Sequence, residues 1–209
     1  MESEHFALQG RHVRLEPLEH RHVDGLVAAA AVDPSIYRWS LVPQGSDAMT
    51  RYVDTAISWR EAGTAAPFAI VRADDGAVIG STRFWAMDRW GWPEGHPEQG
   101  RSGPDTCEIG YTWLTRPAIR TGVNTEAKLL MLTHAFEVWR VFGVCLHTDA
   151  RNEQSRAAME RMGARLDGIL RAHRLASDFR PRDSARYSIV AAEWPNVKQR
   201  LLWLRDKYD

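Results

Sequence analysis

The segment Arg116–Lys128 (RPAIRTGVNTEAK) places glycine, hydroxyl and basic side chains where an apolar run gives way to a helical pattern. The start of a helix offers backbone N–H donors without intrahelical partners, and its dipole favours negative charge, so the segment suits phosphate oxygens. Gly122 lets the backbone approach a ligand, and Arg120 adds charge. The patterns GxxxxGKS/T and GxGxxG of other phosphate-binding loops are absent from the sequence. A plain glycine turn capped by Thr121 is the alternative interpretation.

A second candidate for chemistry is Glu108, in the run TCEIGYTWL at positions 106–114. A carboxylate in such a strand can act as a general base, directly or through water, and burial is expected to raise its pKa toward the useful range. The alternative is a structural carboxylate paired with an arginine. His147 and Asp149 are further candidates for the base.

Other kinds of site find little support. No spacing of His, Cys, Asp or Glu suggests a metal site, and no Ser-His-Asp set stands out. Cys107 and Cys145 lie in apolar stretches, so we expect reduced core thiols rather than a disulfide framework or a nucleophile.

Composition restricts the function further. The 209 residues are 44% hydrophobic and 26% charged, and 27 basic residues balance 27 acidic ones. Nucleic-acid binding through phosphates needs a basic excess, so no nucleic-acid partner is expected. The chain has no apolar run long enough to span a membrane and no signal-peptide pattern, which predicts a cytoplasmic protein without a membrane partner.

Hydrophobic periodicity and turn residues predict one α/β domain over residues 1–209. The expected strands are His12–Pro17, Phe68–Arg72, Ala77–Met87, Thr106–Leu114, Val144–Thr148, Ala164–Ala172 and Ser184–Ala191. The expected helices are Leu18–Val32, Ser46–Gly63, Thr121–Arg140, Asn152–Met162 and Trp194–Arg205. Four glycines and three prolines between Asp88 and Pro104 indicate a long, functional or disordered loop.

Two stretches, RTGVNTEAKLLMLTHAFE and TDARNEQSRAAMERMGARLDGILR, resemble the GCN5-related N-acetyltransferases, in particular the branch that acetylates the N-termini of ribosomal proteins. The resemblance is specific from about Cys107 to Arg171 and extends over the whole chain through the order of elements. It implies a mixed, mostly antiparallel seven-stranded sheet flanked by helices and splayed between its fourth and fifth strands to admit acyl-CoA. Thr106–Leu114 and Val144–Thr148 would be those strands.

The resemblance also implies a cofactor site for acetyl-CoA. The family's pyrophosphate loop follows a Q/R-x-x-G-x-G/A pattern, which falls here on Ile119–Asn124 and keeps only Gly122. Backbone N–H groups would make most of the phosphate contacts. The implied cofactor-binding residues of this loop are Arg120, Thr121, Gly122, Val123, Asn124 and Thr125.

Three further cofactor contacts are implied. In the family, an Asn in the first turn of the next helix touches the coenzyme, which assigns Asn152, although this residue is also a plain helix cap. The family's thiolate-protonating Tyr falls on Met159, so Ser155 is the implied replacement. The oxyanion donor would be a backbone N–H near Trp113 or Leu114.

The acceptor side would be built by the first two helices, the Trp85–Pro104 loop and the loop near His173–Arg182. Trp39, Trp85 and Trp90 are expected to wall an aromatic pocket, and Arg83 to bind an acidic group. The alternative is that these aromatic residues pack the loop or a dimer interface, so a homodimer is one of the possible assemblies.

The sequence therefore predicts an acyl-CoA-dependent N-acyltransferase that passes an acetyl group directly to a primary amine in a ternary complex. A protein N-terminus, an amino acid or aminoacyl compound and an antibiotic all remain candidate acceptors. Glu108 and Ser155 are the expected catalytic residues. A non-catalytic module that binds coenzyme A or a partner protein is the alternative, suggested by Met159 and the imperfect loop.

Overall fold

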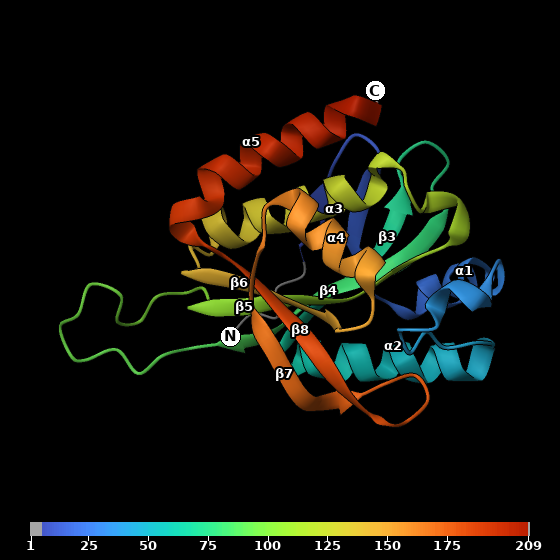
Figure 1. Ribbon diagram of the computed structural model, residues 1–209, viewed down its shortest axis with the longest axis horizontal. Helices are drawn as coiled ribbons and strands as arrows, with labels where there is room; N and C mark the ends of the chain where they lie inside the picture. The colour runs from blue at the N-terminus through green and yellow to red at the C-terminus, as the bar shows by residue number, and fades with distance from the viewer. Residues whose placement is uncertain (1–5, 209) are drawn as a thin grey trace.

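The computed structural model describes residues 6–208 and contains one mixed β-sheet with helices on both faces (Figure 1). Its strands are β1 Leu8–Gln9, β2 Val13–Pro17, β3 Ala65–Arg72, β4 Val78–Asp88, β5 Thr106–Leu114, β6 Gly143–Asp149, β7 Arg165–Leu175 and β8 Pro181–Val190. Its α-helices are α1 Val23–Ala31, α2 Ser46–Glu61, α3 Gly122–Thr133, α4 Glu153–Met162 and α5 Trp194–Arg205.

The sheet has the order β1-β2-β3-β4-β5-β6-β8-β7. Neighbouring strands are antiparallel except for β5 and β6, which run parallel. Their pairing covers only Thr106–Glu108 against Gly143–Cys145, although both strands continue beyond it. The mixed, mostly antiparallel fold is confirmed. The expected count of seven strands is wrong, because the short strand β1 adds an eighth. The strands expected to be fourth and fifth are therefore β5 and β6, and these are the two that diverge.

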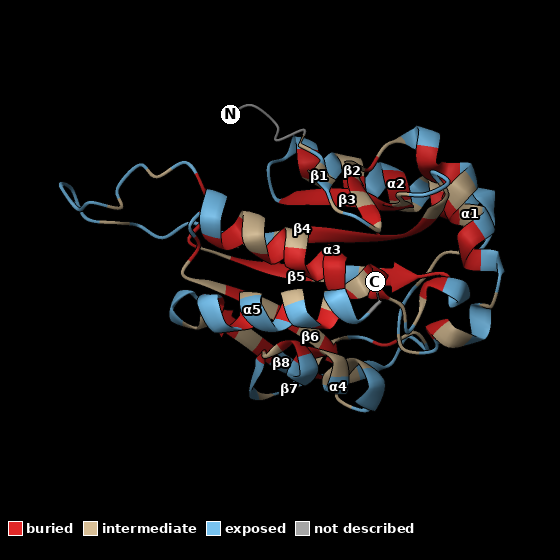
Figure 2. Cartoon of the chain, turned by 90° about the horizontal axis from the view of Figure 1, so that it is seen from above, coloured by how far each residue is buried: buried red, intermediate tan, exposed pale blue. Residues whose placement is uncertain are grey.

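Strand β3 shows how one sheet serves two cores. Phe68 and Ile70 belong to the core under α3 and α5, whereas Ala69 and Val71 belong to the core under α1 and α2. Side chains alternate between the faces of a strand, so a strand buried on both faces reads as a continuous apolar run. Figure 2 shows buried residues along the central strands and on the inner surfaces of the covering helices.

Several predicted elements have other bounds than expected. The helix expected over Thr121–Arg140 is α-helical only as far as Thr133, and a π-helical turn follows over His134–Val138. The last two strands form a longer hairpin than predicted, with β7 reaching Leu175 and β8 beginning at Pro181. The polar segment between them is therefore mostly strand.

The long loop between β4 and β5 is confirmed and extends away from the body of the molecule (Figure 1). Its base is held by the buried carboxylate of Asp105, which accepts hydrogen bonds from the Trp90 backbone N–H (2.6 Å) and from Trp92 Nε1 (2.8 Å). Arg89 donates to the carbonyl oxygens of Ser102 and Gly103. These contacts fix the two ends of the loop.

Candidate functional site

The N-terminus of α3 has the geometry of an anion site. Thr121 is the N-cap residue, and its hydroxyl accepts from the Val123 N–H at 3.3 Å and donates to the Ala118 carbonyl at 2.7 Å. Arg120 has a left-handed backbone (φ 64°), which turns the chain into the helix. The remaining first-turn N–H groups have no partner within the helix. The predicted cap and the predicted N–H donors therefore occur together.

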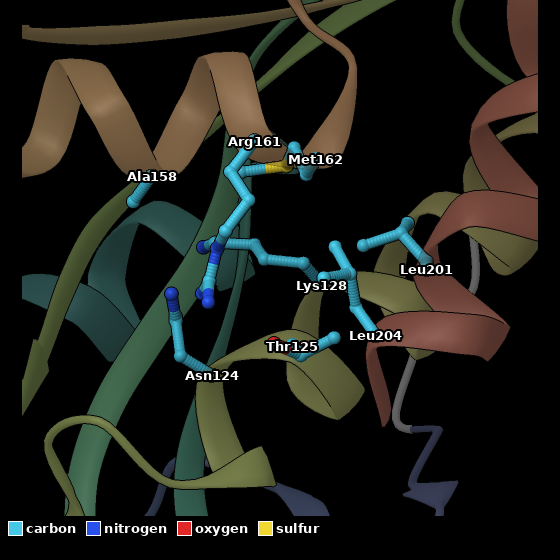
Figure 3. Close-up of a pocket in the computed structure, with 8 residues that line it drawn as sticks. All are labelled: Asn124, Thr125, Lys128, Ala158, Arg161, Met162, Leu201 and Leu204. Atoms are coloured by element: carbon cyan, nitrogen blue, oxygen red, sulfur yellow. The ribbon is translucent and has the colours of Figure 1, made fainter. Parts of the chain in front are cut away.

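A narrow pocket lies between this helix end, α4 and α5 (Figure 3). It is lined by Asn124, Thr125, Lys128, Ala158, Arg161, Met162, Leu201 and Leu204. The Oδ1 atom of Asn124 is buried and lacks a hydrogen-bond partner among residues 6–208. The helix N–H groups and the Arg161 guanidinium are donors that suit a phosphate group, whereas the Asn124 Oδ1 atom is an acceptor and needs a donor instead.

Lys128 does not add its charge at the helix end. Its Nζ donates to Thr112 Oγ1 on β5 at 2.6 Å, and Thr112 in turn lies 2.8 Å from Thr82 Oγ1. Burial lowers the pKa of Lys128 to about 7. This lysine ties α3 to the open strand β5 through hydroxyl groups.

Helix α4 begins directly after β6. The Asn152 Oδ1 atom accepts from the Ser155 N–H at 3.2 Å, which confirms the predicted cap. Asp149 orders the same turn, because its carboxylate binds the Arg151 guanidinium at 2.8 and 2.9 Å. Ser155 is half-buried in the first turn, while Met159, at the family's tyrosine position, is packed into the core. Met159 has no proton to give to a leaving thiolate, and the hydroxyl of Ser155 lies one turn nearer the start of α4.

Glu108 lies at the last paired position of β5 and β6, and only 3% of its surface is exposed. Arg174 on β7 binds both of its carboxylate oxygens, at 3.2 and 2.9 Å. His147 Nδ1 on β6 lies 2.8 Å from Glu108 Oε2. Three strands thus bring a carboxylate, an imidazole and a guanidinium to the point where the sheet opens.

The expected direction of the Glu108 pKa shift is wrong. Burial does raise the pKa, but the contacts with His147 and Arg174 and the positive charge of the Arg174 guanidinium outweigh it and lower the pKa to about 2. A carboxylate with so low a pKa is a weak proton acceptor. The arginine pairing that the sequence left open is present, and the second partner, His147, becomes the better candidate for accepting a proton.

His147 has the setting that a base needs. Its side chain is 7% exposed, and neither ring nitrogen makes a hydrogen bond within the described part of the chain, although Nδ1 lies 2.8 Å from Glu108 Oε2. The ring of His173, on β7, lies 5.0 Å away between centroids. Since Nδ1 faces Glu108, a neutral ring with its proton on Nδ1 leaves the Nε2 lone pair free.

Trp113 and Leu114 end strand β5. The Trp113 ring is buried against Tyr37 (5.8 Å between centroids), and the Leu114 carbonyl accepts from Tyr37 OH at 3.1 Å. Beyond Glu108, β5 pairs with β4 but not with β6 in the described registers. Its edge toward β6 is the place where a backbone N–H could serve a developing oxyanion.

The predicted acceptor residues lie at three separate places. Arg83 and Trp85 on β4 lie on the same face of the sheet as Glu108 on β5, which pairs with Trp85. The rings of Tyr111 and Trp59 contact them. Trp39 lies elsewhere, next to Arg38 and Arg151 at the turn into α4.

Trp90 belongs to the loop base, where its ring stacks on Phe142 at 5.4 Å between centroids. The described rings that contact Trp90 are those of Trp92 and Phe142, and they do not include the rings around Arg83 and Trp85. For Trp90, the alternative that it packs the loop fits these contacts better.

Several residues of the site carry no distinguishing signal in the sequence. Arg174 is one of a cluster of arginines there, and the aromatic residues Tyr52, Trp59 and Tyr111 do not stand out from the other aromatic residues of the chain. Tyr111 has a left-handed backbone (φ 52°), and the β4–β5 register shifts beside it. This irregularity changes which residues of β5 share a face, and the sequence pattern carries no sign of it.

Other chemistries find no support among residues 6–208. Cys107 and Cys145 are free, and burial raises the pKa of both thiols. No group of three potential metal ligands occurs in the described residues, and none of their helices combines the length and apolarity of a membrane span.

Comparison with known proteins identifies the family. Residues 12–165 match the family model described as the acetyltransferase (GNAT) domain. The chain is 32% identical over 92 residues to the putative ribosomal N-acetyltransferase YdaF of Bacillus subtilis; the match covers 44% of this chain and only about half (49%) of that protein.

Solved structures share the fold over nearly the full chain. A GCN5-related N-acetyltransferase from Brucella melitensis superposes with a TM-score of 0.81 at 28% identity, covering 96% of this chain and 86% of that one. Mycobacterium smegmatis RimJ, solved in complex with CoA-disulfide, has a TM-score of 0.78 at 19% identity, with 97% and 96% covered, and shows the fold alone. The family match over residues 12–165, with the diverging parallel strands at the centre of the sheet, places this chain in the GNAT acetyltransferase family.

Proposed function

We propose that the protein is an acetyl-CoA-dependent N-acetyltransferase that acylates a primary amine directly, without a covalent enzyme intermediate. The observation that carries the proposal is the group Glu108–His147–Arg174, with its carboxylate buried, at the point where β5 and β6 stop pairing. On the opposite face of the sheet, the start of α3 offers the anion site. A base and an anion site on either side of one opening suit a thioester donor and an amine acceptor.

Residues Arg120–Thr125 would hold the phosphates, and Asn152 and Ser155 would face the thiol end. Bound acetyl-CoA would supply an activated acyl group as a thioester. RimJ of Mycobacterium smegmatis was solved with a coenzyme A derivative as ligand, and the shared fold supports the same cofactor class here. The N–H groups at the start of α3, which have no partner within the helix, and the Arg161 guanidinium in the adjoining pocket are this chain's own support.

In the proposed mechanism, His147 Nε2 removes a proton from the acceptor ammonium while Glu108 holds the Nδ1–H. The neutral amine forms the new C–N bond at the carbonyl carbon. A backbone N–H on the open edge of β5 donates to the oxyanion. When the C–S bond breaks and the oxyanion returns to a carbonyl, the Ser155 hydroxyl donates its proton to the leaving sulfur and takes up the second proton of the attacking nitrogen, so that the amide, the free thiol and a neutral serine result. Glu108 is in this scheme a positioning residue that acts through His147.

For the acceptor, we propose an N-terminal amine of a protein or a small amine. The likeness to a protein named as a ribosomal N-acetyltransferase supports the first. This chain's own support for an acceptor site is the face of the sheet that carries Glu108, here called the acceptor face. Helix α2 and the β7–β8 hairpin lie along this face, and the hairpin contacts Glu108 through Arg174 (Figure 1).

A thermal-shift experiment tests the cofactor first. Acetyl-CoA, coenzyme A, ATP and NAD are compared at high concentration; a ligand at 100 times its Kd stabilises the folded state by about 2.7 kcal/mol. We expect a rise in Tm with the coenzyme A species only, followed by release of free thiol when an amine is supplied. Absence of any shift with coenzyme A would contradict the proposal.

A non-catalytic coenzyme A-binding module is the second candidate, favoured by the core position of Met159, which leaves the family's usual proton donor missing. A Tm shift with acetyl-CoA but no thiol release with any amine of a broad panel would support it.

A further inference from the structure

An arginine without a counter-ion lies beneath the acceptor face. Arg83, on β4, is 1% exposed, and its Nε and Nη2 atoms have no hydrogen-bond partner among the described residues. Its guanidinium lies over the rings of Tyr111 (4.2 Å), Tyr52 (4.9 Å) and Trp59 (5.3 Å). Aromatic faces stabilise a cation in part, but they accept none of its planar N–H groups.

A further unpaired donor lies next to it. Trp85 follows two residues after Arg83 on the same face of β4, and its buried Nε1–H also lacks a partner in the described chain. Trp85 packs against Tyr111 and stacks on Trp59. Arg83 and Trp85 therefore belong to one aromatic box, which is formed by the rings of Tyr52, Trp59 and Tyr111 around the Arg83 guanidinium together with the Trp85 ring. Buried polar groups are almost always hydrogen-bonded, and two unsatisfied donor residues at one place indicate a missing acceptor.

Residues 6–208 do not supply that acceptor. The nearby carboxylate, Glu108, is already bound at both oxygens by Arg174 and approached by His147. Gly110 on β5 pairs with Arg83, and its lack of a side chain leaves room between Trp85 and Glu108. A Cβ at this position would lie 3.0 Å from Trp85 Nε1 and 3.1 Å from Glu108 Oε1. The region between the box and Glu108 therefore has donors on one side and no side chain at Gly110.

The box is connected to the proposed reaction centre. The Arg174 guanidinium lies 4.5 Å above the Trp85 ring while it binds Glu108. Tyr52 and Trp59 come from α2, on the face of the sheet opposite the α3 anion site. Tyr111, at 40% exposure, is the outermost ring of the box.

We infer that Arg83 and Trp85 bind a carboxylate of the acceptor, so that the preferred substrate is an amine that also carries a carboxylate. The inference rests on the proposed N-acetyltransferase function. A guanidinium presents two parallel N–H groups that match a carboxylate, and the indole N–H adds a third donor. The substrate class is therefore an amino acid or a peptide with an acidic group near its N-terminus.

The test compares matched pairs of acceptors. Glycine, β-alanine, 4-aminobutyrate and an Asp-containing dipeptide are each assayed beside the corresponding amide by release of coenzyme A thiol. For at least one spacing we expect the acid to exceed its amide in kcat/KM by about 10- to 100-fold, the effect of charge-assisted hydrogen bonds. Arg83→Gln should abolish this preference, mainly through a higher KM for the acid.

Two further variants keep the test decisive. Trp85→Phe retains a ring but removes the N–H, and it should reduce the preference for the acid over the amide by a few-fold. This variant keeps the test possible if Arg83→Gln fails to fold. Arg51→Gln removes an exposed arginine from α2 and should leave the preference intact. An acid-to-amide ratio that stays the same in Arg83→Gln and Trp85→Phe would overturn the inference and leave a purely structural cation–π cluster.

Binding measurements separate this inference from the proposed function. The N-acetylated acid and its N-acetylated amide are titrated into the protein by calorimetry, which needs no turnover. Preference for the acid that disappears in Arg83→Gln supports the carboxylate site even if catalysis fails, whereas absent acetyl-CoA binding counts against the proposed function alone. If Arg83→Gln instead impairs only a carboxylated donor such as succinyl-CoA, the carboxylate belongs to the acyl group and the acceptor assignment is wrong.

Discussion

His147 Nδ1 lies 2.8 Å from Glu108 Oε2, between two strands whose pairing ends at Glu108 and Cys145. The contact spans the opening of the sheet just beyond its last paired residues. It gives the imidazole a fixed orientation in a place where the backbone no longer holds the two strands together. The reactivity of this position therefore depends on a side-chain contact.

Replacement of His147 tests the base. We expect His147→Gln to lower kcat by about 100-fold or more, since general-base catalysis contributes 10²- to 10⁴-fold, while the Kd for acetyl-CoA stays nearly unchanged. Steady-state kinetics and calorimetry measure the two quantities. The exposed His20, paired with Asp54, offers the control His20→Gln. Unaltered kcat in His147→Gln would return the role of base to another group.

Glu108 should make the fold sensitive to acid. Its pKa is held at about 2 in the folded protein against an ordinary value of 4.5, so its pairing stabilises the fold above pH 4.5. That contribution declines as the pH falls from 4.5 to 2. The gap in unfolding free energy between the wild type and Glu108→Gln should narrow over this interval. Urea denaturation at pH 6, 4 and 3 measures it, and a gap independent of pH would contradict the lowered pKa.

The start of α3 can be tested through Gly122. A Val at this buried first helical position should crowd the approach of phosphate oxygens to the backbone and raise the Kd for acetyl-CoA about tenfold or more. Gly91→Val is the matched control, because an added Cβ at Gly91 meets no atom within 4 Å. Equal affinities in the two variants, with both folded, would remove the cofactor from this helix end.

Ser155 is tested by its hydroxyl. Ser155→Ala should lower kcat roughly tenfold with a small change in the acetyl-CoA KM, because only the departure of the thiolate loses a donor. Ser155→Thr retains the hydroxyl and should recover much of the rate. If Ala and Thr perform alike, the residue serves only the first turn of α4.

Local signals predicted the parts of the site that local chemistry builds. Asn152 caps α4 and Thr121 caps α3 because a short polar side chain can reach an N–H two or three residues away. Apolar runs also located the central strands to within a few residues. Such features depend on neighbours in the sequence.

The contacts between distant segments could not be predicted in the same way. The pair Glu108 and Arg174 joins residues 66 positions apart, and several arginines compete for the role in the sequence. The Arg83 box depends on the irregular backbone at Tyr111, which no residue pattern announces. Hence the burial of Glu108 could be predicted, whereas the direction of its pKa shift could not, because that direction depends on partners from two distant strands.

Glu126 connects the helix of the proposed cofactor site to the β1–β2 turn. From the first turns of α3, its buried carboxylate accepts the backbone N–H groups of Arg11, His12 and Val13 at 2.9, 2.6 and 3.0 Å. Gly10 lies so close that a Cβ would collide with it. The β1–β2 turn and helix α3 should therefore open together. If acetyl-CoA binds at the start of α3 as proposed, it should slow amide hydrogen exchange at residues 11–13, far along the chain from the β7–β8 hairpin.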